Sequence, residues 1–288
     1  MKSEICPICQ GSAFLDQRAH YELALDQAPT NYKMMRCAGC GLRWMTPYPN
    51  PEDYQTLYDN DYYEALQEGG LSYPEEKQEL LPCYSRIANR FSAFGVTKGL
   101  LDVGCGTGEF LVAAKANGIQ GNGVEPSAYA AEKAAEKGFH IVNGVLADLL
   151  PVSEPYSAVH CSHVLEHVPD ADRFMDELKS VMALGAPLYI EVPRQFDGVL
   201  DVMHRIRGYR RGYSDYSIHH HYFFTPKAIK ILLGAHGFEI LSMTTYLPCR
   251  RAMRKRSVRM FALQSALWLA DRLAGRGDVI SVWARRRA

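Results

Sequence analysis

Three glycines at alternate positions lie between two apolar segments. The run reads Leu100-Leu101-Asp102-Val103-Gly104-Cys105-Gly106-Thr107-Gly108-Glu109-Phe110-Leu111. Glycine adopts positive φ without strain and has no side chain to keep a ligand away from the main chain. A helix that begins near Gly108 points its first N–H groups out of the helix, toward any ligand bound there. The run therefore predicts a strand, a turn that binds a phosphate or a nucleoside, and a helix.

An acidic residue about twenty positions further on favours a nucleoside. The segment from Gly121 onward is expected to be the next strand, and it ends at Glu125. A carboxylate at this place can accept hydrogen bonds from both hydroxyls of a ribose. The glycine spacing alone is only moderately specific, because dinucleotide-binding turns use a similar pattern.

Four cysteines near the N-terminus form a second group of residues whose side chains could do chemistry. Cys6 and Cys9 make one C-x2-C pair, and Cys37 and Cys40 make another. Two close pairs of thiolates suit tetrahedral Zn²⁺ in a structural site with no open coordination position. In a reducing compartment, disulfides are the weaker alternative. We expect the four residues to bind Zn²⁺ in a small N-terminal zinc ribbon.

The elements that must position these residues alternate between strand and helix patterns. Strands are expected near 99–105, 120–126, 139–144, 156–162, 187–193, 238–247 and 279–285, and helices near 108–118, 127–138, 171–184 and 226–234. This alternation implies an α/β fold with a doubly wound parallel sheet. Ligands of such sheets bind at the carboxyl ends of the strands, where the glycine turn is expected to lie.

The compact run from Asp102 to Gly108 resembles the S-adenosylmethionine-binding motif of class I methyltransferases more than an NAD fingerprint. Three later segments, 145–149, 156–170 and 187–193, are similar to the family's third, fourth and fifth strand regions. The resemblance implies a Rossmann-like seven-stranded sheet with an antiparallel last strand. It extends to small-molecule methyltransferases that act on sugars and natural products, some of which carry an N-terminal zinc ribbon.

The resemblance also implies which residues bind S-adenosylmethionine. Glu125 is expected to bind the ribose hydroxyls, and Asp148 the adenine amino group. The full expected set is Asp102, Gly104, Cys105, Gly106, Gly108, Glu125, Pro126, Asp148, Leu149, Cys161 and His163.

Methyl transfer from a sulfonium releases a neutral thioether, so the enzyme must align the reactants and, for a hydroxyl acceptor, remove a proton. Imidazole suits that role near neutral pH. His220 lies in the segment 218–225, which resembles an element before the last helix of small-molecule methyltransferases, and it is the first choice as general base. A metal site or a surface cluster at this histidine run is the alternative. His163 is the second expected catalytic residue, and His167 is expected to be structural.

Charge is balanced overall, with 32 basic and 32 acidic residues, but it is unevenly distributed. Residues 1–98 carry 9 basic and 13 acidic side chains, which argues against RNA as the acceptor. Residues 250–288 carry 11 basic and 2 acidic side chains. Peripheral contact of 250–271 with an anionic membrane is one hypothesis, and a solvated or buried helix is the other.

The chain is expected to consist of a zinc ribbon (1–50), a helical linker or lid (51–98) and a methyltransferase domain (99–288). An arginine-rich and tyrosine-rich insert on the substrate side, 194–222, suits an anionic or phosphorylated acceptor, or is a lid whose arginines only aid solubility. With no run of about eighteen apolar residues and no signal-peptide pattern, a cytoplasmic enzyme is expected. The alternatives are a zinc-ribbon RNA methyltransferase and a non-catalytic module that binds S-adenosylmethionine or a partner. The pattern predicts no oligomeric state.

Overall fold

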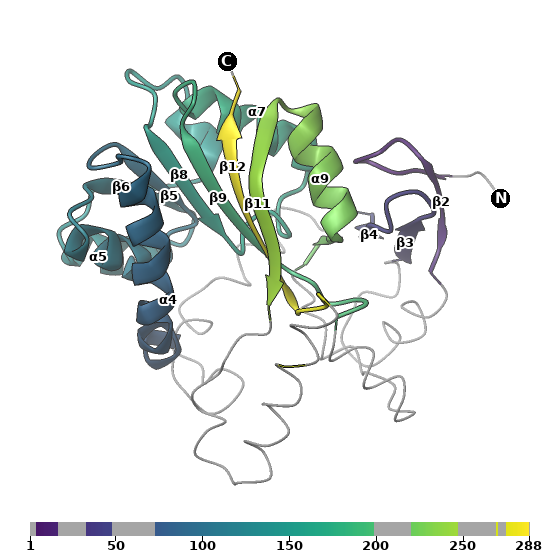
Figure 1. Cartoon of the computed structure of the whole chain (residues 1–288), viewed down its shortest axis with the longest axis horizontal. Helices are drawn as coiled ribbons and strands as arrows, with labels where there is room; N and C mark the ends of the chain where they lie inside the picture. The colour runs from purple at the N-terminus through teal and green to yellow at the C-terminus, as the bar shows by residue number, and fades with distance from the viewer. Residues whose placement is uncertain are drawn as a thin grey trace, which may run out of the picture.

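The computed structural model describes residues 4–16, 33–47, 73–198, 220–246, 269 and 275–287. Its strands form a five-stranded sheet and a seven-stranded sheet (Figure 1). The small sheet contains β1 (Glu4–Ile5), β2 (Ser12–Leu15), β3 (Lys33–Cys37), β4 (Arg43–Thr46) and β10 (Tyr222–Phe223). The large sheet contains β5 (Leu100–Val103), β6 (Gly121–Glu125), β7 (Ile141–Asn143), β8 (Ala158–Ser162), β9 (Pro187–Pro193), β11 (Phe238–Tyr246) and β12 (Val279–Arg286).

Helices cover both faces of the large sheet (Figure 1). They are α4 (Tyr73–Ala93), α5 (Glu109–Ala116), α6 (Ala128–Glu136), α7 (Ala171–Val181) and α9 (Pro226–Ala235), with a short 3-10 helix η2 (Leu146–Leu149). Apolar side chains of α4 and α5 pack on one face, and those of α7 and α9 pack on the other. Ser127, Asp170 and Thr225 cap the first turns of α6, α7 and α9 by accepting a backbone N–H bond.

The strand order of the large sheet is β11-β12-β9-β8-β5-β6-β7. Strands β5 to β9 pair in parallel, whereas β12 lies between β9 and β11 and is antiparallel to both. This arrangement confirms the expected Rossmann-like sheet with an antiparallel last strand. The expected and observed element ends differ by a few residues, because turn residues at strand and helix ends lie outside the regular hydrogen bonding.

Alternate residues of a strand face opposite sides of the sheet. On β5, β8 and β9, the residues Asp102, His160 and Tyr189 stand in register. Tyr189 packs in the core under α4 and α5, so this row lies on the α4/α5 face, and Glu191 follows Tyr189 on the same face. Polar side chains thus cross three adjacent strands on one face of the sheet.

The small sheet is completed by a strand from far along the chain. Tyr222 in β10 pairs with Trp44 in β4, antiparallel. Thr225 Oγ1 donates to the carbonyl oxygen of Cys40 (2.7 Å), and Lys227 Nζ donates to that of Gly39 (2.7 Å). The cysteine-bearing sheet is therefore attached to the segment that leads into α9, a pairing that the sequence pattern did not predict.

Several expectations lie outside the described residues: the basic run 250–259, almost all of the apolar segment 261–270, and most of the insert 194–222. None of the helices in the described part of the chain has the length and apolar character needed to cross a bilayer.

Candidate functional site

The glycine turn joins β5 to α5. Gly104, Gly106 and Gly108 have φ of 68°, 52° and 88°, all in the left-handed region that favours glycine. The N–H of Gly106 donates to Oε2 of Glu125 (2.9 Å), and the N–H of Ser127 donates to Oε1 (2.9 Å). These bonds hold the buried Glu125 carboxylate beside the turn.

Gly104 is also required by the space around it. A Cβ at this position would lie 2.4 Å from Cγ2 of Val164, far inside van der Waals contact. At Gly123 in β6, a Cβ would lie 2.6 Å from Sγ of Cys105. Gly104 is therefore closely packed against the segment that follows β8, and Gly123 against Cys105 of the turn, so a side chain at either glycine would displace these neighbours.

A cavity adjoins the turn at the carboxyl ends of β5 and β8. Its lining among the described residues comprises Tyr84, Asp102, Gly104, Cys105, Glu109, Phe110, His160, Ser162 and His163. Asp102, Gly104, Cys105 and His163 belong to the set expected to bind the cofactor. Tyr84 was not singled out, because it lies on α4 far from any motif.

A buried pair of side chains is part of the lining of this cavity. Nδ1 of His160 is 2.6 Å from Oδ1 of Asp102. The His160 ring is stacked on Phe110, with centroids 3.6 Å apart, and on Tyr189, with centroids 5.4 Å apart. Stacking and hydrogen bonding fix the Asp102 carboxylate in one orientation. His160 was not predicted as a site residue. It lies two residues before Ser162, so the two side chains lie on the same face of β8, and both line the cavity.

The other expected cofactor residues lie on both sides of the turn. The exposed carboxylate of Asp148 accepts a hydrogen bond from the N–H of Val145 (2.7 Å) at the start of η2, and Leu149 ends that helix half-buried. The carbonyl of Pro126 accepts from Nδ2 of Asn143 (3.0 Å), beyond the end of β6. Cys161 is buried in the core on the α7/α9 face and is not among the residues that line the cavity.

His163 follows β8 and has a φ of 57°. Nδ1 lies 3.2 Å from Oε1 of Glu166, and Nε2 lies 3.4 Å from Oε1 of Glu191. Burial lowers the pKa of His163, but hydrogen bonds to the two carboxylates outweigh it and raise the pKa to about 10. The ring is 46% exposed, so solvent screens part of this attraction. With carboxylates at both nitrogens, the imidazole is held as a cation at neutral pH.

Glu191 connects β9 with the neighbouring strands. Its Oε2 accepts hydrogen bonds from the hydroxyls of Tyr189 and Tyr246, the latter at 2.8 Å, and its Oε1 accepts from Oγ of Ser162 at 3.4 Å. Burial raises the pKa of Glu191, but the bonds from His163 and the tyrosines lower it below the usual value. Glu191 was not predicted as a site residue, although strand alternation places it on the same face of β9 as Tyr189.

A second group of side chains surrounds Glu166, whose carboxylate is wholly buried. Nε2 of His167 lies 3.8 Å from Oε1 of Glu166, and Nε2 of His220 lies 4.0 Å from it. Burial raises the pKa of Glu166, but the bond from His163 and the nearby imidazoles lower it to about 2. The two expected catalytic histidines, His163 and His220, thus meet at one carboxylate that sequence reasoning missed.

Backbone hydrogen bonds bring His220 to this place. The N–H groups of His221 and Tyr222 both donate to the carbonyl oxygen of Glu166, at 2.7 and 3.0 Å. Nδ1 of His220 lies 2.8 Å from Oε1 of Gln195, just after β9. Burial lowers the pKa of His221 to about 3, so this neighbour is neutral. His219 lies outside the described residues.

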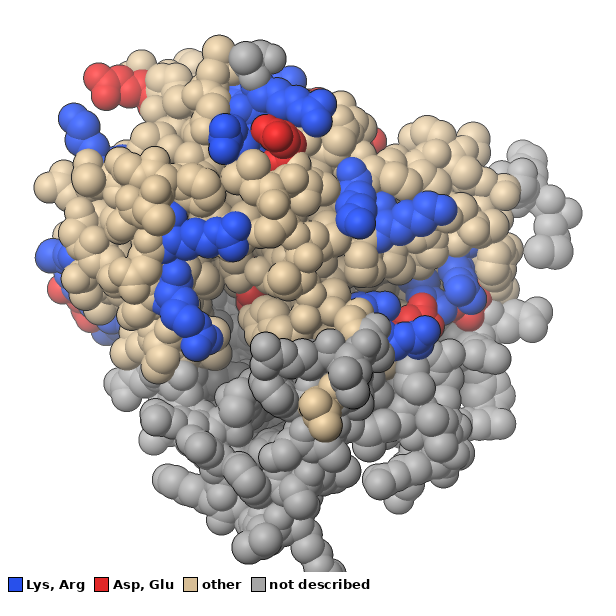
Figure 2. Space-filling model, viewed as in Figure 1, with Lys and Arg blue, Asp and Glu red and all other residues tan. Residues whose placement is uncertain are grey.

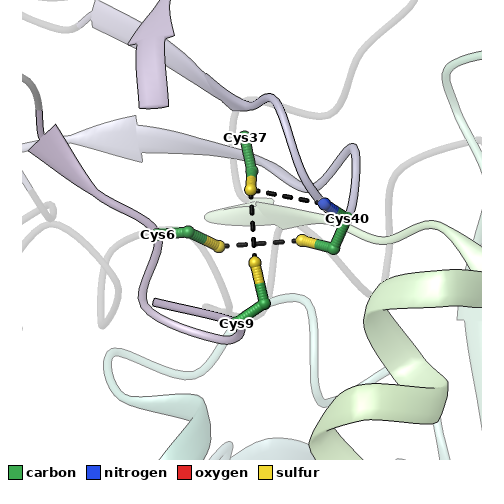
Figure 3. Close-up of side chains that lie close together, drawn as sticks. All are labelled: Cys6, Cys9, Cys37 and Cys40. Atoms are coloured by element: carbon green, nitrogen blue, oxygen red, sulfur yellow. Dashed lines mark hydrogen bonds between the residues drawn. The ribbon is translucent and has the colours of Figure 1, made fainter. Parts of the chain in front are cut away.

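The four expected metal ligands converge in the small sheet, where Figure 3 shows their side chains pointing toward one another. The Sγ atoms of Cys6 and Cys40 are 3.7 Å apart, and those of Cys9 and Cys37 are 3.3 Å apart. Tetrahedral Zn²⁺ with bonds of about 2.3 Å separates its sulfur ligands by about 3.8 Å. The N–H of Cys40 also points at Sγ of Cys37 (3.4 Å). The cluster fits a tetrahedral ion.

Residues 76–243 match the model of a methyltransferase domain family, over more than half of the chain. The chain belongs to this methyltransferase family. A search of curated protein sequences finds no match.

Solved structures share the fold of this methyltransferase. A SAM-dependent methyltransferase from Archaeoglobus fulgidus is 18% identical with a TM-score of 0.51, and the match covers 73% of this chain and 94% of that one. Magnesium protoporphyrin IX methyltransferase from Synechocystis PCC 6803, solved with bound SAH, is 16% identical with a TM-score of 0.54, covering 82% and 100%. The [4+2]-cyclase SpnF is 20% identical with a TM-score of 0.57, covering 84% and 98%.

The methyltransferase is an enzyme that uses S-adenosylmethionine. Its residues suit that cofactor, because the turn at Gly104 has no room for a side chain and Glu125 is fixed beside it. One structural relative is named a cyclase, so the fold alone does not specify the reaction or the acceptor.

Proposed function

We propose that this methyltransferase transfers a methyl group from S-adenosylmethionine to an oxygen, nitrogen or carbon of a small molecule, of the class of sugars, natural products or lipid-linked intermediates. One observation carries the proposal: His163 both lines the cavity at the glycine turn and contacts the Glu166 cluster. The cofactor turn and a group of histidines suited to handling an acceptor therefore lie side by side. When bound, S-adenosylmethionine supplies an electrophilic methyl group.

Two further observations support a small acceptor. The relative from Synechocystis is named for magnesium protoporphyrin IX, a small molecule. In the view of Figure 2, the lysine and arginine side chains of the described surface lie in separate groups rather than in one continuous band. A nucleic acid would favour a continuous basic surface.

In this proposal His220 activates the acceptor. Both ring nitrogens of His163 already face carboxylates, so neither offers a lone pair to a substrate. Oε1 of Gln195 accepts from Nδ1–H of His220, which makes Nε2 the basic nitrogen. In the simplest mechanism, Nε2 of His220 takes the proton of an acceptor hydroxyl, and the His163 cation orients the acceptor.

The proposal also includes the other roles that were expected from the sequence. Glu125 binds the ribose hydroxyls and Asp148 the adenine amino group. The four cysteines bind a structural Zn²⁺ within 1–50, 51–98 serves as a linker or lid, and 99–288 carries the chemistry. Arginines of 194–222 suit an anionic or phosphorylated acceptor. Replacing Arg210 and Arg211 should then reduce turnover only of phosphorylated acceptors.

The test is the formation of S-adenosylhomocysteine with a panel of phenols, amines and nucleotide-linked sugars, by wild type and by His220→Ala. We expect turnover with at least one acceptor class, and a loss of about a hundredfold in the variant with unchanged cofactor binding. His236→Ala is the matched control, because His236 contacts Asp172 and Asp176 on α7, in another part of the molecule. Methyl transfer to RNA and to none of the small molecules would overturn the proposal.

A further inference from the structure

We propose that Glu166, His167 and His220 bind a divalent transition-metal ion that holds the acceptor's oxygen. The inference rests on the proposed function and specifies how His220 activates the acceptor: as a metal ligand rather than as the base itself. One ligand atom of each residue lies within 4.8 Å of the other two, and Nε2 of each histidine lies near Oε1 of Glu166. This site is separate from the four-cysteine cluster, which offers only sulfur.

The distances within this cluster match ligands around an ion better than hydrogen bonds. Nε2 of His167 and Nε2 of His220 lie 3.8 and 4.0 Å from Oε1 of Glu166. Hydrogen bonds between such atoms measure about 2.7–3.2 Å. Two ligands with bonds of about 2.0–2.2 Å to one ion lie about 3–4 Å apart. A small contraction of the side chains would therefore complete the coordination.

The carboxylate at the centre is costly without further partners. The Glu166 side chain is wholly buried, and its Oε2 has no hydrogen-bond partner among the described residues. A buried ionised carboxylate is disfavoured unless it is paired, hydrogen-bonded or bound to a metal. His163 supplies one partner at 3.2 Å, on Oε1 only. A bound cation would balance the rest of this buried charge.

A hydrogen bond to Gln195 already orients the His220 ring in the way that metal binding requires. A metal-bound histidine usually donates its other ring N–H to an oxygen, which fixes the tautomer and the ring. Nδ1 of His220 lies 2.8 Å from Oε1 of Gln195, and its Nε2 is the nitrogen on the Glu166 side. The rings of His167 and His220 stand at 72° to each other, with centroids 4.7 Å apart, and Oε1 of Glu166 lies 3.8 and 4.0 Å from their Nε2 atoms.

The ligand set indicates both the metal and its use. Two imidazoles and one carboxylate suit ions such as Mn²⁺, Co²⁺ or Zn²⁺ better than Ca²⁺, and three protein ligands leave positions open for substrate. A hydroxyl oxygen bound there has a lowered pKa and loses its proton to water. The oxygen lone pair then forms the O–CH3 bond, the C–S bond breaks, and its electron pair stays on sulfur. One proton is released for each ether and each S-adenosylhomocysteine formed.

The test uses Mn²⁺, because this ion prefers nitrogen and oxygen ligands and binds poorly to a zinc-loaded cluster of thiolates. Binding of Mn²⁺ to the full chain is measured by electron paramagnetic resonance, for wild type, His167→Ala, His220→Ala and the control His236→Ala. We expect one Mn²⁺ per chain, an affinity reduced about tenfold or more in the first two variants, and no change in the control. Circular dichroism checks that each variant is folded.

Cofactor affinity is measured on the same samples. Absence of Mn²⁺ binding by the wild type, or equal binding by all variants, overturns the metal site. If S-adenosylmethionine still binds in that case, the proposed methyl transfer stands and His220 acts as a base. Metal binding that depends on both histidines supports the inference, and it does so even for a protein whose acceptor is unidentified.

Discussion

The N–H of His221 donates a hydrogen bond of 2.7 Å to the carbonyl oxygen of Glu166. This bond joins the segment after β8, next to the cofactor turn, to the chain that enters β10. Because β10 is also a strand of the cysteine-bearing sheet, backbone hydrogen bonds connect that sheet with the residues around Glu166. The cysteine-bearing sheet therefore helps to place His220.

Loss of the ribbon metal should impair turnover more than cofactor binding. In Cys37→Ser we expect the zinc content to fall and, since a structural metal contributes folding free energy, a lower melting temperature. The displaced β10 should lower turnover about tenfold, while the affinity for S-adenosylmethionine changes less than about threefold. Cys83→Ser, which alters a cysteine of α4 outside the cluster, is the control for zinc analysis and calorimetry. Full turnover by a zinc-free variant would contradict the role of the ribbon.

Gly104→Ala should disrupt the turn for two separate reasons. Its φ of 68° disfavours any side chain by about 1–2 kcal/mol, and its Cβ would lie 2.4 Å from Val164. Gly118→Ala is the matched control, because its φ of 78° is similar but a Cβ there meets nothing within 4 Å. Urea unfolding should show the larger loss for Gly104→Ala, and adding Val164→Ala should recover the steric part alone. Equal losses at both glycines would count against close packing at the turn.

Removing one donor to Glu191 should cost stability. Tyr246→Phe deletes a hydroxyl 2.8 Å from a buried carboxylate, and bonds to charged groups contribute about 1.5–3 kcal/mol. The free energy of unfolding should fall by about that amount. Tyr156→Phe is the control, because the Tyr156 hydroxyl is in no hydrogen bond within the described structure, and its effect should stay within about 0.5 kcal/mol. Similar values for the two variants would show that Glu191 does not depend on this bond.

The lowered pKa of Glu191 predicts that the stability of the protein depends on pH. The pKa of Glu191 is lowered from 4.5 in the folded protein, so its ionised form favours folding. That contribution is complete above pH 4.5 and is lost as the pH falls through the folded value. Glu191→Gln should therefore lose less stability than the wild type between pH 4.5 and more acidic conditions, measured by urea unfolding. Parallel curves would rule out this linkage.

Local patterns were enough to predict the fold and the position of Glu125 beside the glycine turn. The strand before Gly104, the three glycines and the carboxylate of Glu125 follow one another along the chain, so short-range spacing reveals them. Alternating strands and helices indicated the doubly wound sheet, and the resemblance implied the antiparallel β12.

The cluster around Glu166 depends on contacts between distant segments, which spacing does not show. A two-residue strand such as β10 has no period to detect, and nothing local indicates that Tyr222 pairs with Trp44. Glu166 and Glu191 look like ordinary polar residues until burial and their donors are known. His167 was expected to be structural, and nothing in the sequence indicated that its Nε2 lies 3.8 Å from Oε1 of Glu166, next to His220.

The central claim is that the glycine turn and Glu125 bind S-adenosylmethionine. Titration calorimetry with S-adenosylmethionine and S-adenosylhomocysteine, on wild type, Glu125→Ala and the exposed control Glu136→Ala, tests it most directly. We predict micromolar binding by wild type and control, and about tenfold weaker binding or more by Glu125→Ala, the scale of a lost hydrogen-bonded charge. A folded wild-type protein that binds neither ligand, or a Glu125→Ala variant that binds as tightly as wild type, would contradict it.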